Sequence, residues 1–113
     1  MPRRLVNMPR RVITTVKDAE ELKPEQNVVF LYRMIHCPHC VLLSKVWKKA
    51  LKEVSPSKNI VEIERKFLPK LTDGLNDIRS FPTIISFDKN NRRVLFDEDR
   101  TVDNLKTFIN KYG

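Results

Sequence analysis

The chain of 113 residues is 41% hydrophobic and 32% charged, which predicts one packed domain with an ionic surface. Lysine and arginine outnumber aspartate and glutamate by 22 to 14, and the net charge of +8 favours acidic partners. Two glycines exclude a glycine-rich phosphate loop, and two cysteines exclude a disulfide-dense secreted scaffold. No long apolar run is present, so we expect no transmembrane helix and no membrane partner.

The first eleven residues form a predicted basic arm, separate from a domain predicted over residues 12–113. Arg3, Arg4, Arg10 and Arg11 precede the first acidic residue of the chain. We expect a poorly ordered, solvated terminus, and contact of these arginines with nucleic acid or another polyanion is the second interpretation. Prolines in this arm oppose the amphipathic helix of a mitochondrial presequence. No apolar run typical of a secretory signal comes after the arginines. We therefore expect a cytoplasmic protein, or a virion-associated one if the source is viral.

Strand and helix patterns alternate after the arm. The β-branched residues 12–16 predict a short strand, and residues 18–21 resemble a capping box that begins a helix. The nearly continuous apolar run 28–34 predicts a strand that is buried on both faces. A helix is expected next, because these apolar residues recur at helical spacing: Cys40, Leu43, Val46, Trp47, Ala50, Leu51 and Val54. Trp47 is interpreted as a core residue of that helix.

The second half of the chain predicts a strand over 59–63 and a weak helix over 68–78. Residues 83–87 and 93–96 predict a hairpin, and Thr101 can cap a final helix. The order of the elements predicts an α/β fold with a mixed central β-sheet flanked by helices, in which the hairpin supplies an antiparallel edge.

Two cysteines lie three positions apart, where the buried strand ends and the long helix begins. Pro38 suits the first helical position, so Cys37 lies at the helix N-terminus, where free N–H groups and the helix dipole stabilise a thiolate. His39 adds positive charge when it is protonated. We therefore predict that Cys37 attacks disulfides and that Cys40, one turn later and pointing inward, resolves the mixed disulfide.

Other interpretations of the cysteine pair stay open. His36 and His39 suggest a zinc site within one chain or between two, although ligands this close in sequence cannot easily surround a tetrahedral ion. The cysteines could also be two ordinary buried thiols or a structural disulfide bond. A redox-active pair is the favoured interpretation, and it needs no metal or organic cofactor because the two thiols carry both electrons.

From about residue 12 to its end, the chain resembles a thioredoxin-fold thiol–disulfide oxidoreductase. The sequences CPHC and, further on, IRSFPT carry the resemblance. It implies that Pro82 is cis and packs beside the cysteines, and that Phe81 pairs its backbone with an extended substrate, with Pro38 and Thr83 nearby. Protein thiols and disulfides are the implied substrates, an unidentified redox partner recycles the pair, and a monomer is expected.

The subfamily is indicated by the residues around the motif. Pro-His between the cysteines matches the bacterial periplasmic disulfide oxidant, and His39 and Phe81 resemble protein disulfide isomerase domains. The spacing of Phe96, Arg100 and Leu105 is similar to that of the isomerases, which implies that Arg100 lowers the pKa of the resolving thiol. These features favour an oxidising or isomerising protein over a strong reductant.

Several positions depart from the family pattern. Leu31 stands where relatives keep a buried acid, so proton transfer at Cys40 must use water or another group. His36 replaces a tryptophan, and Asn91 and Asp99 replace glycines. The alternative to an enzyme is a non-catalytic binding module whose basic surface contacts nucleic acid or another polyanion.

Overall fold

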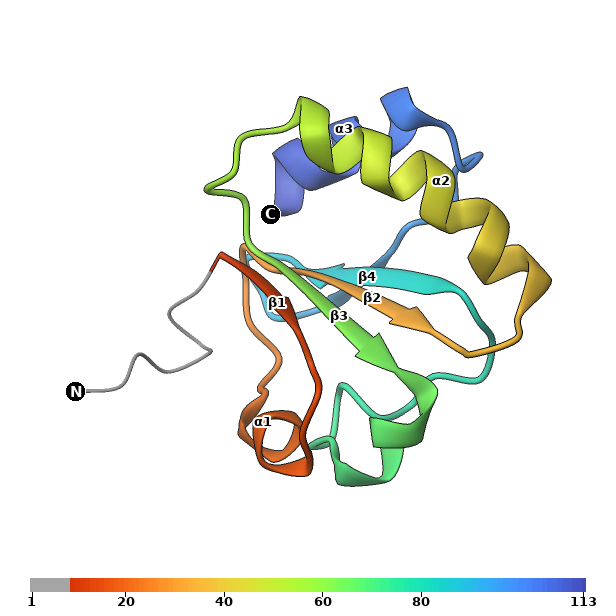
Figure 1. The fold of residues 1–113 in the computed structure, drawn as a ribbon. Helices are drawn as coiled ribbons and strands as arrows, with labels where there is room; N and C mark the ends of the chain where they lie inside the picture. The colour runs from red at the N-terminus through yellow and green to blue at the C-terminus, as the bar shows by residue number, and fades with distance from the viewer. Residues whose placement is uncertain (1–8) are drawn as a thin grey trace.

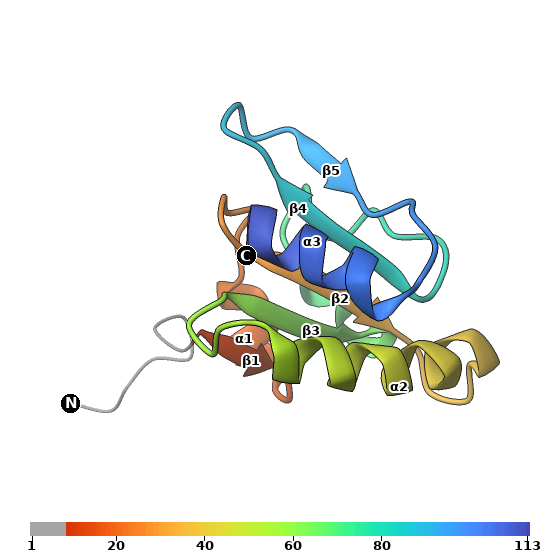
Figure 2. The same cartoon turned by 90° about the horizontal axis from the view of Figure 1, so that it is seen from above.

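One β-sheet lies between two helical layers in the computed structural model, which describes residues 9–113 (Figure 1). The elements are β1 (Arg10–Val12), α1 (Val16–Glu21), β2 (Val29–Arg33), α2 (Pro38–Glu53), β3 (Ile60–Glu64), the 3₁₀ helix η2 (Arg65–Lys70), β4 (Thr83–Phe87), β5 (Arg93–Leu95) and α3 (Val102–Tyr112). Helices α2 and α3 cover one face of the sheet, as the view from above shows (Figure 2), and α1 lies on the other face. Within this described range, no helix combines the length and the apolar character needed to cross a bilayer.

The sheet is mixed, as the sequence predicts. Its strand order is β1-β3-β2-β4-β5. The first three strands are parallel, and β4 and β5 form the antiparallel edge. The register places Leu31 of β2 opposite Glu62 of β3. This arrangement confirms the α/β class and puts the carboxyl end of β2 beside the start of α2.

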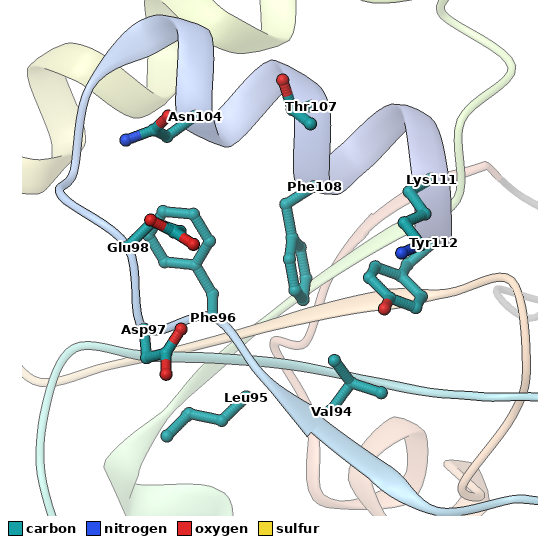
Figure 3. Close-up of a pocket in the computed structure, with 10 residues that line it drawn as sticks. All are labelled: Val94, Leu95, Phe96, Asp97, Glu98, Asn104, Thr107, Phe108, Lys111 and Tyr112. Atoms are coloured by element: carbon teal, nitrogen blue, oxygen red, sulfur yellow. The ribbon is translucent and has the colours of Figure 1, made fainter.

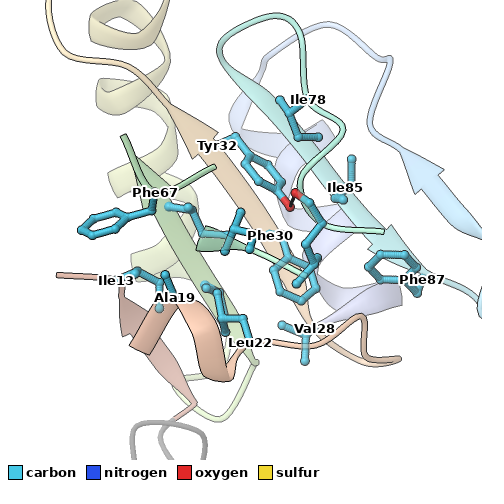
Figure 4. Packing of buried hydrophobic residues seen from close by; sticks show 14 residues of the cluster. Ile13, Ala19, Leu22, Val28, Phe30, Tyr32, Phe67, Ile78, Ile85 and Phe87 are labelled. Carbon is cyan, nitrogen blue, oxygen red and sulfur yellow. Dashed lines mark hydrogen bonds between the residues drawn. The ribbon is translucent and has the colours of Figure 1, made fainter. Parts of the chain in front are cut away.

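The two faces of the sheet carry separate apolar cores. Phe30 and Tyr32 of β2 point to the side of α1, where they join the cluster drawn in Figure 4. The Tyr32 hydroxyl donates to the carbonyl of Leu75 at 2.8 Å, which anchors the long loop after η2. Leu31 points the other way, into the core beneath α2 and α3 that also contains Trp47. Trp47 is 2% exposed, which confirms it as a core residue.

The N-terminal strand begins earlier than predicted. It spans Arg10–Val12, and Thr15 caps α1 by accepting a hydrogen bond from the Asp18 N–H at 3.1 Å. The side-chain cap therefore ends the extended run three residues before the predicted helix start. Arg10 and Arg11 belong to β1, so the sheet begins two residues before the predicted start of the domain at residue 12. Residues 1–8, with Arg3 and Arg4, lie outside the described residues.

The predicted helix over 68–78 is also wrong. Helix η2 ends at Lys70, and a loop leads from there to β4. Gly74 has a φ of 91°, which a right-handed helix excludes. The apolar spacing arises because Leu71, Leu75 and Ile78 are buried against the α1 side of the sheet without a helix.

Candidate redox site

Cys37 occupies the N-cap position of α2, as predicted, and Pro38 opens the helix. Its sulfur accepts a hydrogen bond from the backbone N–H of Cys40 at 3.3 Å. Its thiol donates to the carbonyl of Phe81 at 3.6 Å, a weak bond that joins the helix start to the loop before β4. The preceding residue, His36, has a left-handed φ of 60°, an uncommon conformation outside glycine that turns the chain into the helix.

The pKa values of the two thiols shift in opposite directions. The hydrogen bond from the Cys40 side chain lowers the pKa of Cys37; burial opposes this effect, and backbone N–H groups and the charge of Arg100 assist it. Burial raises the pKa of Cys40, and the hydrogen bond to Cys37 adds to the rise. Cys37 therefore loses its proton at a lower pH than Cys40 does. Since the thiolate is the reactive form, this order favours Cys37 as the attacking residue.

The two cysteines differ in burial. Cys37 is 5% exposed, whereas Cys40 is partly buried. Cys40 lines a cavity beneath α2 together with the core residues Leu31 and Trp47, in keeping with the prediction that it points inward. Hydrogen bonds and the charge of Arg100 thus lower the pKa of Cys37, whereas burial is the main cause of the raised pKa of Cys40.

The loop before β4 brings the predicted proline to the cysteines. The Phe81–Pro82 peptide bond is cis. The Arg100 guanidinium donates to the Pro82 carbonyl at 3.4 Å, so Arg100 lies beside the site, where its charge lowers the pKa of both thiols. Thr83, the first residue of β4, donates its hydroxyl to the Ser80 carbonyl at 2.7 Å within the loop.

The two histidines of the motif are exposed. His39 contacts Cys37 through its backbone N–H, which helps to lower the pKa of that thiol. The predicted effect of its imidazole stays a prediction. Among residues 9–113, no three His, Cys, Asp or Glu side chains are grouped as metal ligands.

Apolar side chains surround the motif on the solvent side. Ile35, Val41 and Leu42 are 57%, 56% and 62% exposed. Ile35 also borders a groove of about 570 Å³, whose other wall includes Arg65 and Lys66 of η2. An extended chain that approaches Cys37 would meet an apolar rim with basic groups at one edge.

A smaller cavity of about 100 Å³ lies behind Cys40. Leu31, 4% exposed, forms part of its wall, together with Glu62 and Arg33. Arg33 donates to the Glu62 carboxylate at 2.6 Å. This ion pair was not among the features predicted from the sequence. Its only sequence signal is a glutamate that lies between Val61 and Ile63 in β3.

Another groove lies between β5 and α3 (Figure 3). It measures about 400 Å³, and Phe96, Phe108 and Tyr112 form its aromatic wall. Neither cysteine borders it. It is therefore separate from the candidate redox site.

Replacing Arg100 with glutamine is expected to raise the pKa of both thiols, because a positive charge that favours both thiolates is removed. Since Arg100 is exposed, we expect the thiolate population near neutral pH to fall by only about two- to fivefold. A pH titration of thiolate ultraviolet absorbance measures the change. Arg92→Gln removes an exposed charge from the β4–β5 turn and should leave both titrations unmoved. Equal titrations of Arg100→Gln and the unaltered protein would contradict the role of Arg100.

Comparison with known proteins identifies the fold. The family model named Thioredoxin matches residues 12–111. The J-Trx1 fragment of ERdj5 is similar in structure, with a TM-score of 0.68 and 19% identity over 91% of this chain, which spans 49% of that fragment. The Trx4 domain of ERdj5 gives a TM-score of 0.64 and 10% identity over 92% of this chain and 95% of the domain. No curated protein matches the sequence significantly. The fold is the thioredoxin fold.

Proposed function

The chain belongs to the thioredoxin family, and from that membership we propose that it is a thiol–disulfide oxidoreductase acting on protein substrates through Cys37 and Cys40. The observation that carries the proposal is the position of Cys37 at the N-cap of α2 within a CXXC motif, where its sulfur accepts the Cys40 N–H at 3.3 Å beside the loop that contains Pro82. The opposite pKa shifts of the two thiols agree with it. A lowered pKa at the helix N-terminus supports attack by Cys37. A raised pKa at Cys40 supports an order in which the second thiol reacts later.

The reaction has two exchange steps. The Cys37 thiolate attacks one sulfur of a substrate disulfide, forms a mixed disulfide and releases the other sulfur as a thiolate. Cys40 then loses its proton and attacks the Cys37 sulfur, which forms the Cys37–Cys40 bond and releases the second substrate thiolate. Two electrons pass from the protein dithiol to the substrate, and the reverse sequence oxidises a substrate dithiol.

The surface around the motif supports a peptide substrate. Phe81, Pro38 and Thr83 are proposed to contact it, with the apolar rim of Ile35 and Val41 beside them. Proline has no backbone N–H, so the substrate backbone is proposed to pair at Phe81 rather than at Pro82. The groove along η2 is lined by Arg65 and Lys66 as well as by Glu64, and its excess of positive charge is proposed to favour substrates with acidic residues on one side of their cysteine.

An oxidising or isomerising role is proposed within this function. The hydrogen bonds and charge that lower the pKa of Cys37 stabilise the dithiol form, and a more stable dithiol form makes the disulfide more oxidising. Thioredoxin has a reduction potential of about −270 mV, and we expect that of the Cys37–Cys40 pair to be higher. Equilibration of the pair with glutathione buffers measures it. A potential at or below that value would assign the protein to the reductants.

A peptide disulfide with a fluorescence readout tests the proposed activity itself. The protein should exchange the peptide disulfide faster than an equal concentration of glutathione does. Protein alkylated at both thiols is the control and should add nothing to the background rate. An unaltered protein that is no faster than the alkylated one would contradict the proposed function.

A further inference from the structure

The cavity behind Cys40 contains one carboxylate. Of the residues that line it, Cys40 comes from α2, Leu31 and Arg33 from β2, Glu62 from β3, and Pro82 from the loop before β4. We propose that Glu62 accepts the Cys40 proton through water in this cavity when Cys40 attacks the mixed disulfide. The inference rests on the proposed function and adds a proton acceptor to it.

The pairing of β2 with β3 places the Glu62 side chain at the wall of this cavity. Glu62 lies opposite Leu31 in the parallel pairing of β2 and β3, and the two side chains share the face covered by α2. The Glu62 side chain is 16% exposed, and Arg33 holds its carboxylate at 2.6 Å. The carboxylate is therefore fixed at the cavity wall instead of moving freely in solvent.

Cys40 needs an acceptor for its proton. Burial and the neighbouring Cys37 raise the Cys40 pKa, so near neutral pH the resolving residue is mainly a thiol. The thiolate is the reactive form, so resolution requires that this proton leave. A carboxylate that lines the same cavity as the thiol can act as its general base through water.

The cavity has room for the bridging water. Its volume is about 100 Å³, and roughly 10–15 Å³ is enough to hold one water molecule. The proton passes from the Cys40 sulfur through water to the Glu62 carboxylate. The thiolate attacks the Cys37 sulfur, and the departing substrate sulfur leaves as a thiolate that takes up a proton from solvent.

Other charged groups face Cys40 and Glu62 and affect how the proton transfer between them depends on pH. Arg33 on β2 bonds the carboxylate, and Lys48 on α2 also lines the cavity. Arg100, before α3, lowers the pKa of Cys40, whereas the charge of Cys37 raises it. From β1, the residue opposite Glu62 is the apolar Val12. None of these cations can accept the proton while it is charged.

Stopped-flow reaction of the reduced protein with an excess of an aromatic disulfide that releases a coloured thiol separates the two attacks. The first phase is second-order and reports Cys37, and the second phase is independent of reagent concentration and reports Cys40. We expect Glu62→Gln to slow the second phase by about tenfold to a hundredfold near neutral pH. The first phase should stay unchanged, and the two proteins should converge at high pH, where Cys40 ionises without help.

Controls separate this proposal from the function on which it rests. Glu53→Gln removes a carboxylate that is paired with Lys106 on the outer surface, at 3.2 Å, and should leave both phases unchanged. Glu62→Leu is a second variant that must show the same loss, in case Glu62→Gln unfolds. A missing first phase in the unaltered protein would overturn the proposed function. A normal first phase, with an unchanged second phase in a folded Glu62 variant, would overturn only the role of Glu62.

Discussion

Replacing Cys40 with serine is expected to leave substrate proteins covalently attached to Cys37. The variant keeps the thiol with the lowered pKa, and serine supplies a hydroxyl in place of the Cys40 thiol beside it. Attack on a substrate disulfide therefore continues, but no second thiol can release the mixed disulfide. Incubation with a disulfide-containing protein and separation on non-reducing gels should show adducts that disappear on reduction. Turnover of a peptide disulfide should fall to background.

The matched control is Cys37→Ser. It keeps Cys40, whose pKa burial raises, so we expect no adducts and no turnover near neutral pH. The comparison assigns the two roles, because both variants lose turnover and only one should trap substrate. Equal trapping by both variants would show that the attacking and resolving thiols are not distinct.

Replacing Leu31 with glutamate is expected to lower the free energy of unfolding by about 2–4 kcal/mol at neutral pH. Leu31 is 4% exposed and lies opposite Glu62, so the new carboxylate would be buried beside an existing one. Burial and a like charge both raise the pKa of an introduced carboxyl in the folded state. Its protonated form is tolerated better, so the loss of stability should be smallest below the unfolded-state pKa of about 4.3 and should grow as the pH rises.

Denaturant unfolding at several pH values measures this effect. Leu31→Gln has the same size and polarity without a charge, so its loss of stability should not grow with pH in the same way. The stopped-flow second phase of Leu31→Glu should be no faster than that of the unaltered protein, because Glu62 is proposed to serve Cys40 already. A faster second phase would mean that the unaltered cavity lacks an effective base. A pH-independent loss of stability would contradict the placement beside Glu62.

The parts of the structure that depend on local chemistry could be predicted from the sequence. Thr101 caps α3 as expected, since its hydroxyl accepts the Asn104 N–H at 3.1 Å. Strand β4 spans Thr83–Phe87, as its β-branched and aromatic residues predict. The position of Cys37 at the N-terminus of α2 could be predicted because a buried strand, a proline and an apolar repeat at helical spacing follow one another in the sequence. Each of these signals acts over a few neighbouring residues.

The parts that depend on contacts across the sheet could not be predicted. Leu71 and Leu75 are spaced like helix residues, but they lie in a loop and are buried in the core. The hydrogen bond from Tyr32 to the Leu75 carbonyl holds this loop in place. Glu62 lines the same cavity as Cys40 only because β3 lies beside β2 in a particular register, with α2 packed above them. The acid that the family pattern predicts at position 31 is absent, and nothing local indicates that the neighbouring strand supplies one.

The early start of β1 limits the attraction of the N-terminus for polyanions. Arg10 donates to the carbonyls of Leu51 and Ser55 at 2.9 and 3.3 Å, and Arg11 is 5% exposed with a pKa that burial lowers. Each phosphate that a cation neutralises on duplex DNA contributes about −0.9 to the slope of log affinity against log salt concentration. Because Arg11 is buried and Arg10 is held against α2 by two hydrogen bonds, we expect these two arginines to contribute less to that slope than their charge alone suggests.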